Sequence, residues 1–168
     1  MPQPPIGYGA PEQISVTTTH NRHGQVLAIT DSSGLRAANE YDANGQVKRM
    51  YDALGDVESR FYDRAGRLTD SHDGNGVVTH FTYDAANRVL TRTDDYGGLA
   101  LQMVFVYDGQ GRVTRVTEPG GRVTETTYYA DGRVRDVIVD PEGLNIVTRY
   151  EYDLTGNVIK LTEPLVGE

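Results

Sequence analysis

Residues 62–68 read YDRAGRL, and residues 107–113 read YDGQGRV. Each heptad places Tyr-Asp before two variable residues, a glycine, an arginine and an aliphatic residue. Setting aside the Tyr-Asp pair at 51, the related tyrosines at 41, 62, 83, 107, 128 and 152 are spaced by 21, 21, 24, 21 and 24 residues. A fixed period of this kind is typical of a repeat architecture, in which one supersecondary unit is stacked many times.

Asp-x-x-Gly tetrads mark the turns, two in each period. Nine non-overlapping intact copies occur, against roughly two expected from composition alone. Aspartate at the first turn position accepts hydrogen bonds from backbone amides two or three residues later, and glycine at the fourth adopts a positive φ. The tetrads therefore predict hairpin turns that begin at Asp31, Asp42, Asp52, Asp63, Asp73, Asp94, Asp108, Asp140 and Asp153.

The segments between these turns are about six or seven residues long and are rich in Val, Thr and Tyr, which are good strand formers. Where alternation is clean, Val77, Phe81 and Tyr83 share one face, while His80 and Thr82 share the other. No segment has a sustained helical period. We therefore predict an all-β fold of antiparallel hairpin repeats, about 21–24 residues each, that form a continuous β-strip or solenoid.

The repeats define two regions of the chain. Residues 1–18 hold four of the seven prolines and match no repeat, which indicates a flexible Pro-rich N-terminal tail. Residues 19–168 are expected to form an array of about six to seven hairpins. Repeat arrays usually carry atypical capping units, and none is recognisable here. The array is therefore expected to be a segment of a longer one, or to pair its open edges with another chain.

Composition excludes several classes of function. The net charge of −8 and the pI near 4.9 argue against nonspecific attraction to nucleic acid. The sequence has no cysteine, so thiolate chemistry and disulfides are excluded. It also has no apolar run long enough to cross a bilayer, and residues 1–5 lack the features of a signal peptide.

Arginine often follows the turn glycine. Such arginines are expected to lie over tyrosine rings or to pair with turn carboxylates. The residues expected to carry the repeat are the Tyr-Asp pairs, the turn glycines and these arginines: Tyr41, Asp42, Gly45, Tyr62, Asp63, Gly66, Arg67, Tyr83, Asp84, Arg88, Tyr107, Asp108, Gly111, Arg112, Tyr128, Gly132, Arg133, Tyr152, Asp153 and Gly156.

The heptads resemble the YD repeats of the Rhs family, which are shared with the C components of insecticidal toxin complexes and with teneurins. The resemblance covers residues 19–168. It implies a β-strand strip that spirals into a hollow shell, which in bacterial members encloses a toxic C-terminal domain. It also implies a bacterial, exported protein, and some members of the family have been linked to carbohydrate binding. Family shells use many more repeats, so this array is expected to form at most an arc of wall.

Residues 140–144, DPEGL, are similar to the sequence near the self-cleavage point of bacterial shells. The ordinary repeat pattern continues directly after them, at Tyr152 and Asp153. We therefore interpret residues 140–144 as another turn, in which Pro141 presets φ.

No catalytic or metal site is expected. His20 and His23 lack an apparent third ligand for a metal. The carboxylates recur at every turn, whereas glycoside hydrolysis needs two in a unique cleft. The nonapeptide pattern of calcium-binding β-rolls is absent, and so are P-loop and dinucleotide fingerprints. No cofactor is therefore predicted.

The sequence thus predicts a non-catalytic structural module, a wall segment that encloses or docks a polypeptide cargo. The alternative is a carbohydrate-binding module that uses its tyrosine-rich face, although the chain has no tryptophan. Expected partners are a polypeptide cargo or further repeats, with glycans as the alternative ligand and neither nucleic acid binding nor membrane insertion.

Overall fold

The computed structural model describes residues 15–162, and the chain divides into two units, residues 1–60 and 61–168. The first unit contains four strands and most of a fifth, β5, which ends at Tyr62. The strands that begin in it are β1 (Thr17–His20), β2 (Val26–Asp31), β3 (Gly34–Tyr41), β4 (Val47–Asp52) and β5 (Gly55–Tyr62). Residues 1–14 of the predicted N-terminal tail (residues 1–18) lie outside the described residues. Because β1 begins at Thr17, the exact boundary of the tail stays a prediction.

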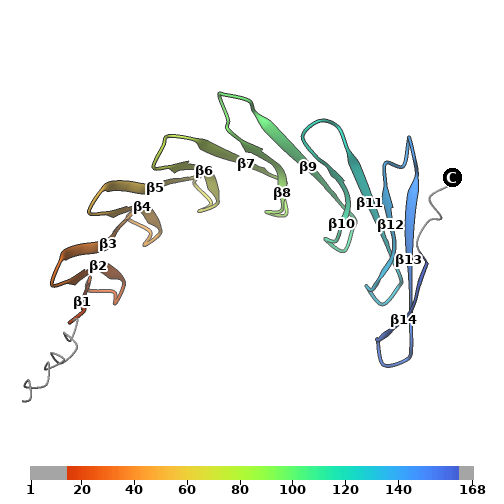
Figure 1. Cartoon of the computed structure of the whole chain (residues 1–168), viewed down its shortest axis with the longest axis horizontal. Coiled ribbons are helices and arrows are strands. Elements are labelled where there is room, and N and C mark those ends of the chain that lie inside the picture. The colour runs from red at the N-terminus through yellow and green to blue at the C-terminus, as the bar shows by residue number, and fades with distance from the viewer. Residues whose placement is uncertain (1–14, 163–168) are drawn as a thin grey trace, which may run out of the picture. The chain divides into compact units, whose positions relative to one another are not determined.

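The second unit contains nine further strands, which Figure 1 shows in chain order. They are β6 (Leu68–Asp73), β7 (Val78–Tyr83), β8 (Val89–Asp94), β9 (Leu101–Tyr107), β10 (Val113–Thr117), β11 (Val123–Tyr128), β12 (Val134–Val139), β13 (Ile146–Tyr152) and β14 (Val158–Thr162).

Within each unit every strand pairs antiparallel with the strand before or after it in the chain. This arrangement confirms the predicted all-β fold of antiparallel hairpin repeats. Residues 15–162 contain no helix long and apolar enough to span a bilayer. A β-bulge recurs where each hairpin leaves its Tyr-Asp turn; for example, Tyr83 lies opposite Val89 and Thr82 lies opposite Thr91.

The Tyr-Asp turns are five-residue loops of constant geometry. In the loop 108–112, the amide of Asp108 donates to the carbonyl of Arg112 at 2.9 Å, and the amide of Gly111 donates to the carbonyl of Asp108 at 3.0 Å. Gly111 has φ of 85°, which is the left-handed conformation predicted for the fourth tetrad position. Asn87 takes this position in the turn 84–88 with φ of 63°, as expected for the residue that tolerates this region best after glycine.

Two turns at the other ends of the strands have a different build. Residues 95–100 and 140–145 form six-residue loops, in which the first and last residues have φ between 51° and 53°. The first of these loops is built from Asp95, not from Asp94 as predicted, because Asp94 still pairs with Leu101 in the ladder. Residues 140–144 form a turn, as interpreted from sequence, but its positive φ falls on Asp140 and Asn145 instead of Gly143.

A glycine is required in these six-residue loops for space. The aspartate side chain folds back over the loop and accepts the leucine amide, Leu99 from Asp95 and Leu144 from Asp140, at 2.8 Å in both cases. A Cβ on Gly98 or Gly143 would collide with that carboxylate. The two loops therefore share these hydrogen bonds although their sequences, DYGGLA and DPEGLN, share only three residues. They differ at the third residue, where Gly97 has φ of 98° and Glu142 has no positive φ.

The sheet is a single layer with almost no enclosed core. Among the described residues only Ala38, Thr93 and Asp136 are buried, at 3–4% exposure. On one face of the second unit a cross-strand row of mainly apolar side chains runs through directly opposite positions, which are Phe105, Val116, Thr124, Val139 and Ile146. A neighbouring row on the opposite face is more polar and includes Arg115 and Glu125.

Candidate functional site

Each Tyr-Asp turn is organised by its aspartate. In the loop 108–112, Oδ1 of Asp108 accepts the amides of Gln110 and Arg112, both at 2.9 Å. Oδ1 therefore accepts the amides of the second and fourth residues after the aspartate, whereas the sequence predicted the second or third. The third amide, that of Gly111, is used by the main-chain carbonyl of Asp108. These hydrogen bonds, with the Arg112 backbone amide the strongest influence, hold the pKa of Asp108 below its ordinary value.

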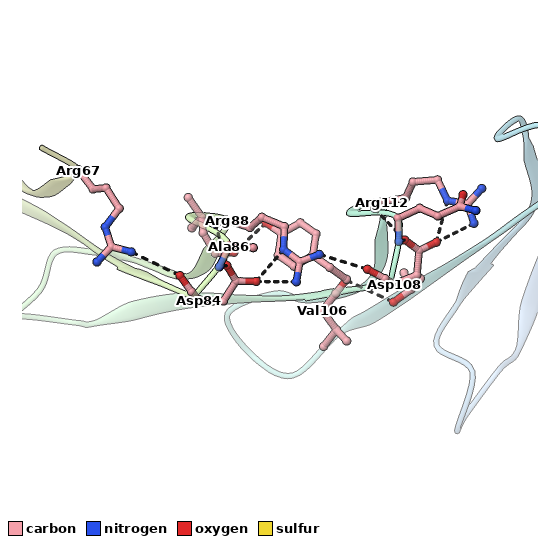
Figure 2. Close-up of polar contacts among 11 residues, drawn as sticks. Arg67, Asp84, Ala86, Arg88, Val106, Asp108 and Arg112 are labelled. Carbon is pink, nitrogen blue, oxygen red and sulfur yellow. Dashed lines mark hydrogen bonds and ion pairs between the residues drawn. The ribbon is translucent and has the colours of Figure 1, made fainter. Parts of the chain in front are cut away.

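The arginine after the turn connects its own hairpin to the next one, as Figure 2 shows for Arg88. Its Nε donates to Oδ2 of Asp84 in the same turn at 2.6 Å. Its Nη1 donates to the main-chain carbonyl of Asp108 in the next turn at 3.1 Å. Its guanidinium carbon lies 4.6 Å from the ring centroid of Tyr107. We call this set of three contacts the arginine clamp.

The arginine clamp recurs through the second unit. The guanidinium carbons of Arg67, Arg112 and Arg133 lie 4.9, 4.4 and 4.8 Å from the ring centroids of Tyr83, Tyr128 and Tyr152. Their Nη1 atoms donate to the next turn's first carbonyl at 3.1–3.4 Å. The sequence predicted either stacking on tyrosine or pairing with a carboxylate, and the arginines make both contacts at once.

The tyrosines also connect the repeats through their hydroxyl groups. The hydroxyl of Tyr107 donates to the carbonyl of Val89 at 2.8 Å, and that of Tyr128 donates to the carbonyl of Val113 at 2.6 Å. Each acceptor is the first strand residue after the preceding Tyr-Asp turn. Sequence analysis did not anticipate this bond, although an aliphatic residue recurs 15 or 18 positions before these tyrosines.

One turn keeps the clamp although its aspartate is missing. Tyr129 stands where the other turns have aspartate, and its hydroxyl donates to the carbonyl of Tyr150 at 3.0 Å. Asp131 supplies the carboxylate instead, and its Oδ2 accepts Nη2 of Arg133 at 2.6 Å. This hydrogen bond to Arg133 lowers the pKa of Asp131. The clamp can therefore take its carboxylate from a different position in the loop.

The first unit replaces the arginine by a glutamine. Gln25 follows the turn glycine Gly24, and its Nε2 donates to the carbonyl of Gly45 at 2.7 Å. Its Oε1 accepts Nδ2 of Asn21, which stands at the aspartate position, at 2.8 Å. The hydroxyl of Tyr41 donates to the carbonyl of Val26 at 2.8 Å, as in the second unit. The tyrosine bond is thus common to both units, while the charged clamp belongs to the second.

The repeat residues predicted from sequence have equivalent positions in the structure. The five turn glycines, Gly45, Gly66, Gly111, Gly132 and Gly156, have φ between 81° and 92°. Asp42, Asp63, Asp84, Asp108 and Asp153 each accept two backbone amides of their own turn through Oδ1. Tyr62 ends β5 and is half-buried.

A polar cluster on the sheet was not predicted. Asp136 is 3% exposed, and its carboxylate accepts Nε of Arg149 at 2.6 Å, Nε of Arg135 at 2.9 Å and the hydroxyl of Thr127 at 3.0 Å. The bond from Arg149, followed by those from Arg135 and Thr127, lowers the pKa of Asp136 from 3.8 to about 2 despite burial. The cluster joins β11, β12 and β13 on one face.

His80, which the sequence placed on the strand face opposite Phe81, has specific partners. Its Nδ1 lies 2.7 Å from Oδ1 of Asp70, and its ring stacks on Tyr96 with centroids 4.6 Å apart. Asp70 lies directly opposite His80 in the β6–β7 pair, and the sequence alone does not define that register.

These arrangements hold strands together. The carboxylates of the clamps and of Asp136 accept hydrogen bonds from arginines, backbone amides and the hydroxyl of Thr127. Within residues 15–162 no group of three His, Cys, Asp or Glu side chains could hold a metal ion.

The repeat matches a known family model, and the fold matches solved structures. The family model described as RHS Repeat matches residues 41–69, 62–99, 107–143 and 128–165, which together are more than half of the chain. No curated protein matches the sequence. The solved structure titled as the TcdB2-TccC3-Cdc42 complex aligns with 92% of this chain at 18% identity and a TM-score of 0.78. A Tc holotoxin pore from Photorhabdus luminescens aligns with 88% of this chain at 18% identity and a TM-score of 0.73. The alignment covers 9% of each of those two chains, so this chain spans about a tenth of their length.

Proposed function

The chain belongs to the RHS repeat family, and from that premise we propose that it is a non-catalytic wall segment of a β-shell that encloses or docks a polypeptide cargo. In this proposal the shell is an exported bacterial assembly, and the segment acts by steric exclusion, keeping the cargo from water and proteases. The partners are further repeats, joined edge to edge, and the enclosed polypeptide.

The observation that carries the proposal is the single-layer sheet. A sheet with only three buried side chains among its described residues cannot be stabilised by a core of its own. The arginine clamps and tyrosine hydroxyl bonds join neighbouring hairpins along the sheet. A sheet held together in this way leaves both faces available, one to the cargo and one to the surroundings.

Paired charges on the face that carries Arg115 and Glu125 support its enclosing role. Arg115 lies beside Glu125 at 3.0 Å, and Asp136 is shared by two arginines. No buried side-chain nitrogen or oxygen of the described residues lacks a hydrogen-bond partner. Because these charges are satisfied within the wall, the face has little tendency to bind one cargo sequence over another.

The glycan-binding alternative needs tyrosine rings that are open to a sugar. In the second unit four such rings are covered by guanidinium groups, and three of those tyrosines also donate their hydroxyls to main-chain carbonyls. This geometry favours a packing role for the tyrosines. We therefore do not adopt the alternative as a second proposal, but the test includes it.

The test is absolute mass in solution, measured by size-exclusion chromatography with light scattering over a range of concentrations. A wall segment is expected to associate through its open edges into a defined oligomer. That oligomer should protect a permanently unfolded polypeptide, such as reduced and carboxymethylated lactalbumin, from protease. A monomer at all concentrations that gives no protection would overturn enclosure by this chain, and saturable retention on a glycan array would favour the alternative.

A further inference from the structure

Tyr41 lacks the arginine that covers its counterparts in the second unit. In the second unit the guanidinium carbons of Arg67, Arg88, Arg112 and Arg133 lie 4.4–4.9 Å from the tyrosine of the next repeat. Among the described residues no arginine lies over Tyr41, because the corresponding position is occupied by Gln25. Gln25 is shorter than arginine and uncharged.

The structure has a pocket at this place. A cavity of about 630 Å³ is lined by residues of the turns 21–25 and 42–46, including Gln25, Tyr41 and Asp42. Its walls are polar and apolar in nearly equal parts, with Asn21, Asn44 and His23 among the polar residues and Leu27 and Ala43 among the apolar ones. The whole pocket lies within the first unit.

The neutral glutamine makes only part of the contacts of a clamp. It connects Asn21 to the carbonyl of Gly45, whereas the arginines of the second unit donate to the carbonyl of the first turn residue. The Asp42 carbonyl, which is the equivalent acceptor here, receives only the amide of Gly45 among the described residues. Gln25 thus reaches the glycine of the next turn, as the arginines do, but leaves the carbonyl at the equivalent of their acceptor position without a side-chain donor.

We propose that this pocket binds the guanidinium group of an arginine side chain presented by a partner polypeptide. The ligand chemistry follows from the chain itself, which fills four equivalent positions with its own arginines. Tyr41 supplies the π-face, and the Asp42 carbonyl and the Gln25 side chain supply hydrogen-bond acceptors.

Charges at the rim act in opposite directions. Asp42 provides a carboxylate, while Arg22 is an exposed cation whose Nε donates to Nε2 of His23 at 3.2 Å. Arg22 disfavours a second cation nearby and therefore weakens binding. Its removal is expected to strengthen the site.

The first experiment is an NMR titration of the ¹⁵N-labelled full chain with N-acetyl-L-arginine methylamide. Saturable shifts are expected for the Gln25 side-chain amide and for the backbone amides of residues 42–45. The citrulline analogue has nearly the same shape without the charge and should bind about two- to fivefold more weakly, which is the cation–π contribution at an exposed site. Equal binding of both compounds, or no saturable shift, would overturn the proposal.

Two variants test the position of the site. Gln25→Arg fills the pocket with the chain's own guanidinium and should abolish the response to the arginine compound. Arg112→Gln opens the equivalent position over Tyr128, where a new arginine-dependent response should appear. A Gln25→Arg protein that still binds at residues 42–45, or an Arg112→Gln protein that folds without a new response at Tyr128, would contradict the inference. Arg22→Ala should increase affinity.

Discussion

The first unit and the second unit build the same hairpin turns but connect successive hairpins with different side chains. In the second unit an arginine makes an ion pair, a stacking contact and a main-chain hydrogen bond. In the first unit Gln25 makes two neutral hydrogen bonds at the corresponding position. Turn geometry and the connection between turns are thus separable. The Asp-x-x-Gly loop forms the hairpin, and the residue after the glycine supplies the side-chain contacts to the next hairpin.

The largest effect is expected from changing the turn itself, which both units share. Gly111→Val places a β-branched residue at φ of 85° and should lower the free energy of unfolding by about 1–3 kcal/mol. Gly109→Val is the matched control, because that glycine lies in the same loop without a positive φ and with open space around it. Thermal unfolding measures both, and Gly66→Val should behave like Gly111→Val. Unchanged melting temperatures in both positive-φ variants would refute the turn model.

The next effect distinguishes the two units directly. Arg112→Gln gives the second unit a connection of the kind found in the first. The loss of an ion pair and of the contact with Tyr128 should cost about 1–2 kcal/mol. Hydrogen exchange should become faster in β9 to β12 and stay constant in β1 to β4. Equal acceleration in both regions would show that the clamp does not act locally.

A smaller effect should be the same in both units. Tyr107→Phe removes the hydroxyl donor to Val89 and leaves that carbonyl without the bond, at a cost of about 1 kcal/mol. Tyr41→Phe removes the equivalent donor to Val26. Denaturant titrations of the two variants should give similar losses, and a much larger loss in the second unit would mean that the hydroxyl bond depends on the arginine above it.

The last prediction concerns how the stability of the second unit changes at acid pH. Asp136 has a folded pKa of about 2, below its ordinary value of 3.8. Its contribution to stability is therefore complete above about pH 4 and is lost as the pH falls through 2. Asp136→Asn should flatten the decline of stability between about pH 4 and pH 2, measured by urea titration at each pH. An identical decline in wild type and variant would exclude Asp136 as a source.

The repeat was the part of the fold that sequence predicted best, because the turns carry their own chemistry. The period of the tyrosines and the nine tetrads predicted the hairpins, and the paired strands confirm them. The exact start of the loop at Asp95 was not predictable, since Asp94 and Asp95 both begin an Asp-x-x-Gly tetrad. Which of them enters the loop depends on the ladder pair between Asp94 and Leu101.

The contacts between hairpins were predicted only in part. Stacking of arginine on tyrosine was foreseen because both residues recur in one register. The polar partners of Asp136 and His80 were not, because they come from neighbouring strands whose register is set by pairing along the whole ladder. For Thr127 and Asp136 that register is also shifted by a bulge at the Tyr-Asp turn. The position of a bulge depends on the turn and on the strand pairing together, so it cannot be predicted from one residue type.

The pairing of each strand with its chain neighbours also bears on how such a chain folds. Every hairpin is closed by a loop of a few residues, so its ends meet at a small entropic cost and without waiting for distant segments. Hairpins can thus form one after another from either end, in the microsecond range typical of isolated hairpins. A chain with this topology can be pulled apart from one end and can re-form in the order in which its hairpins are released.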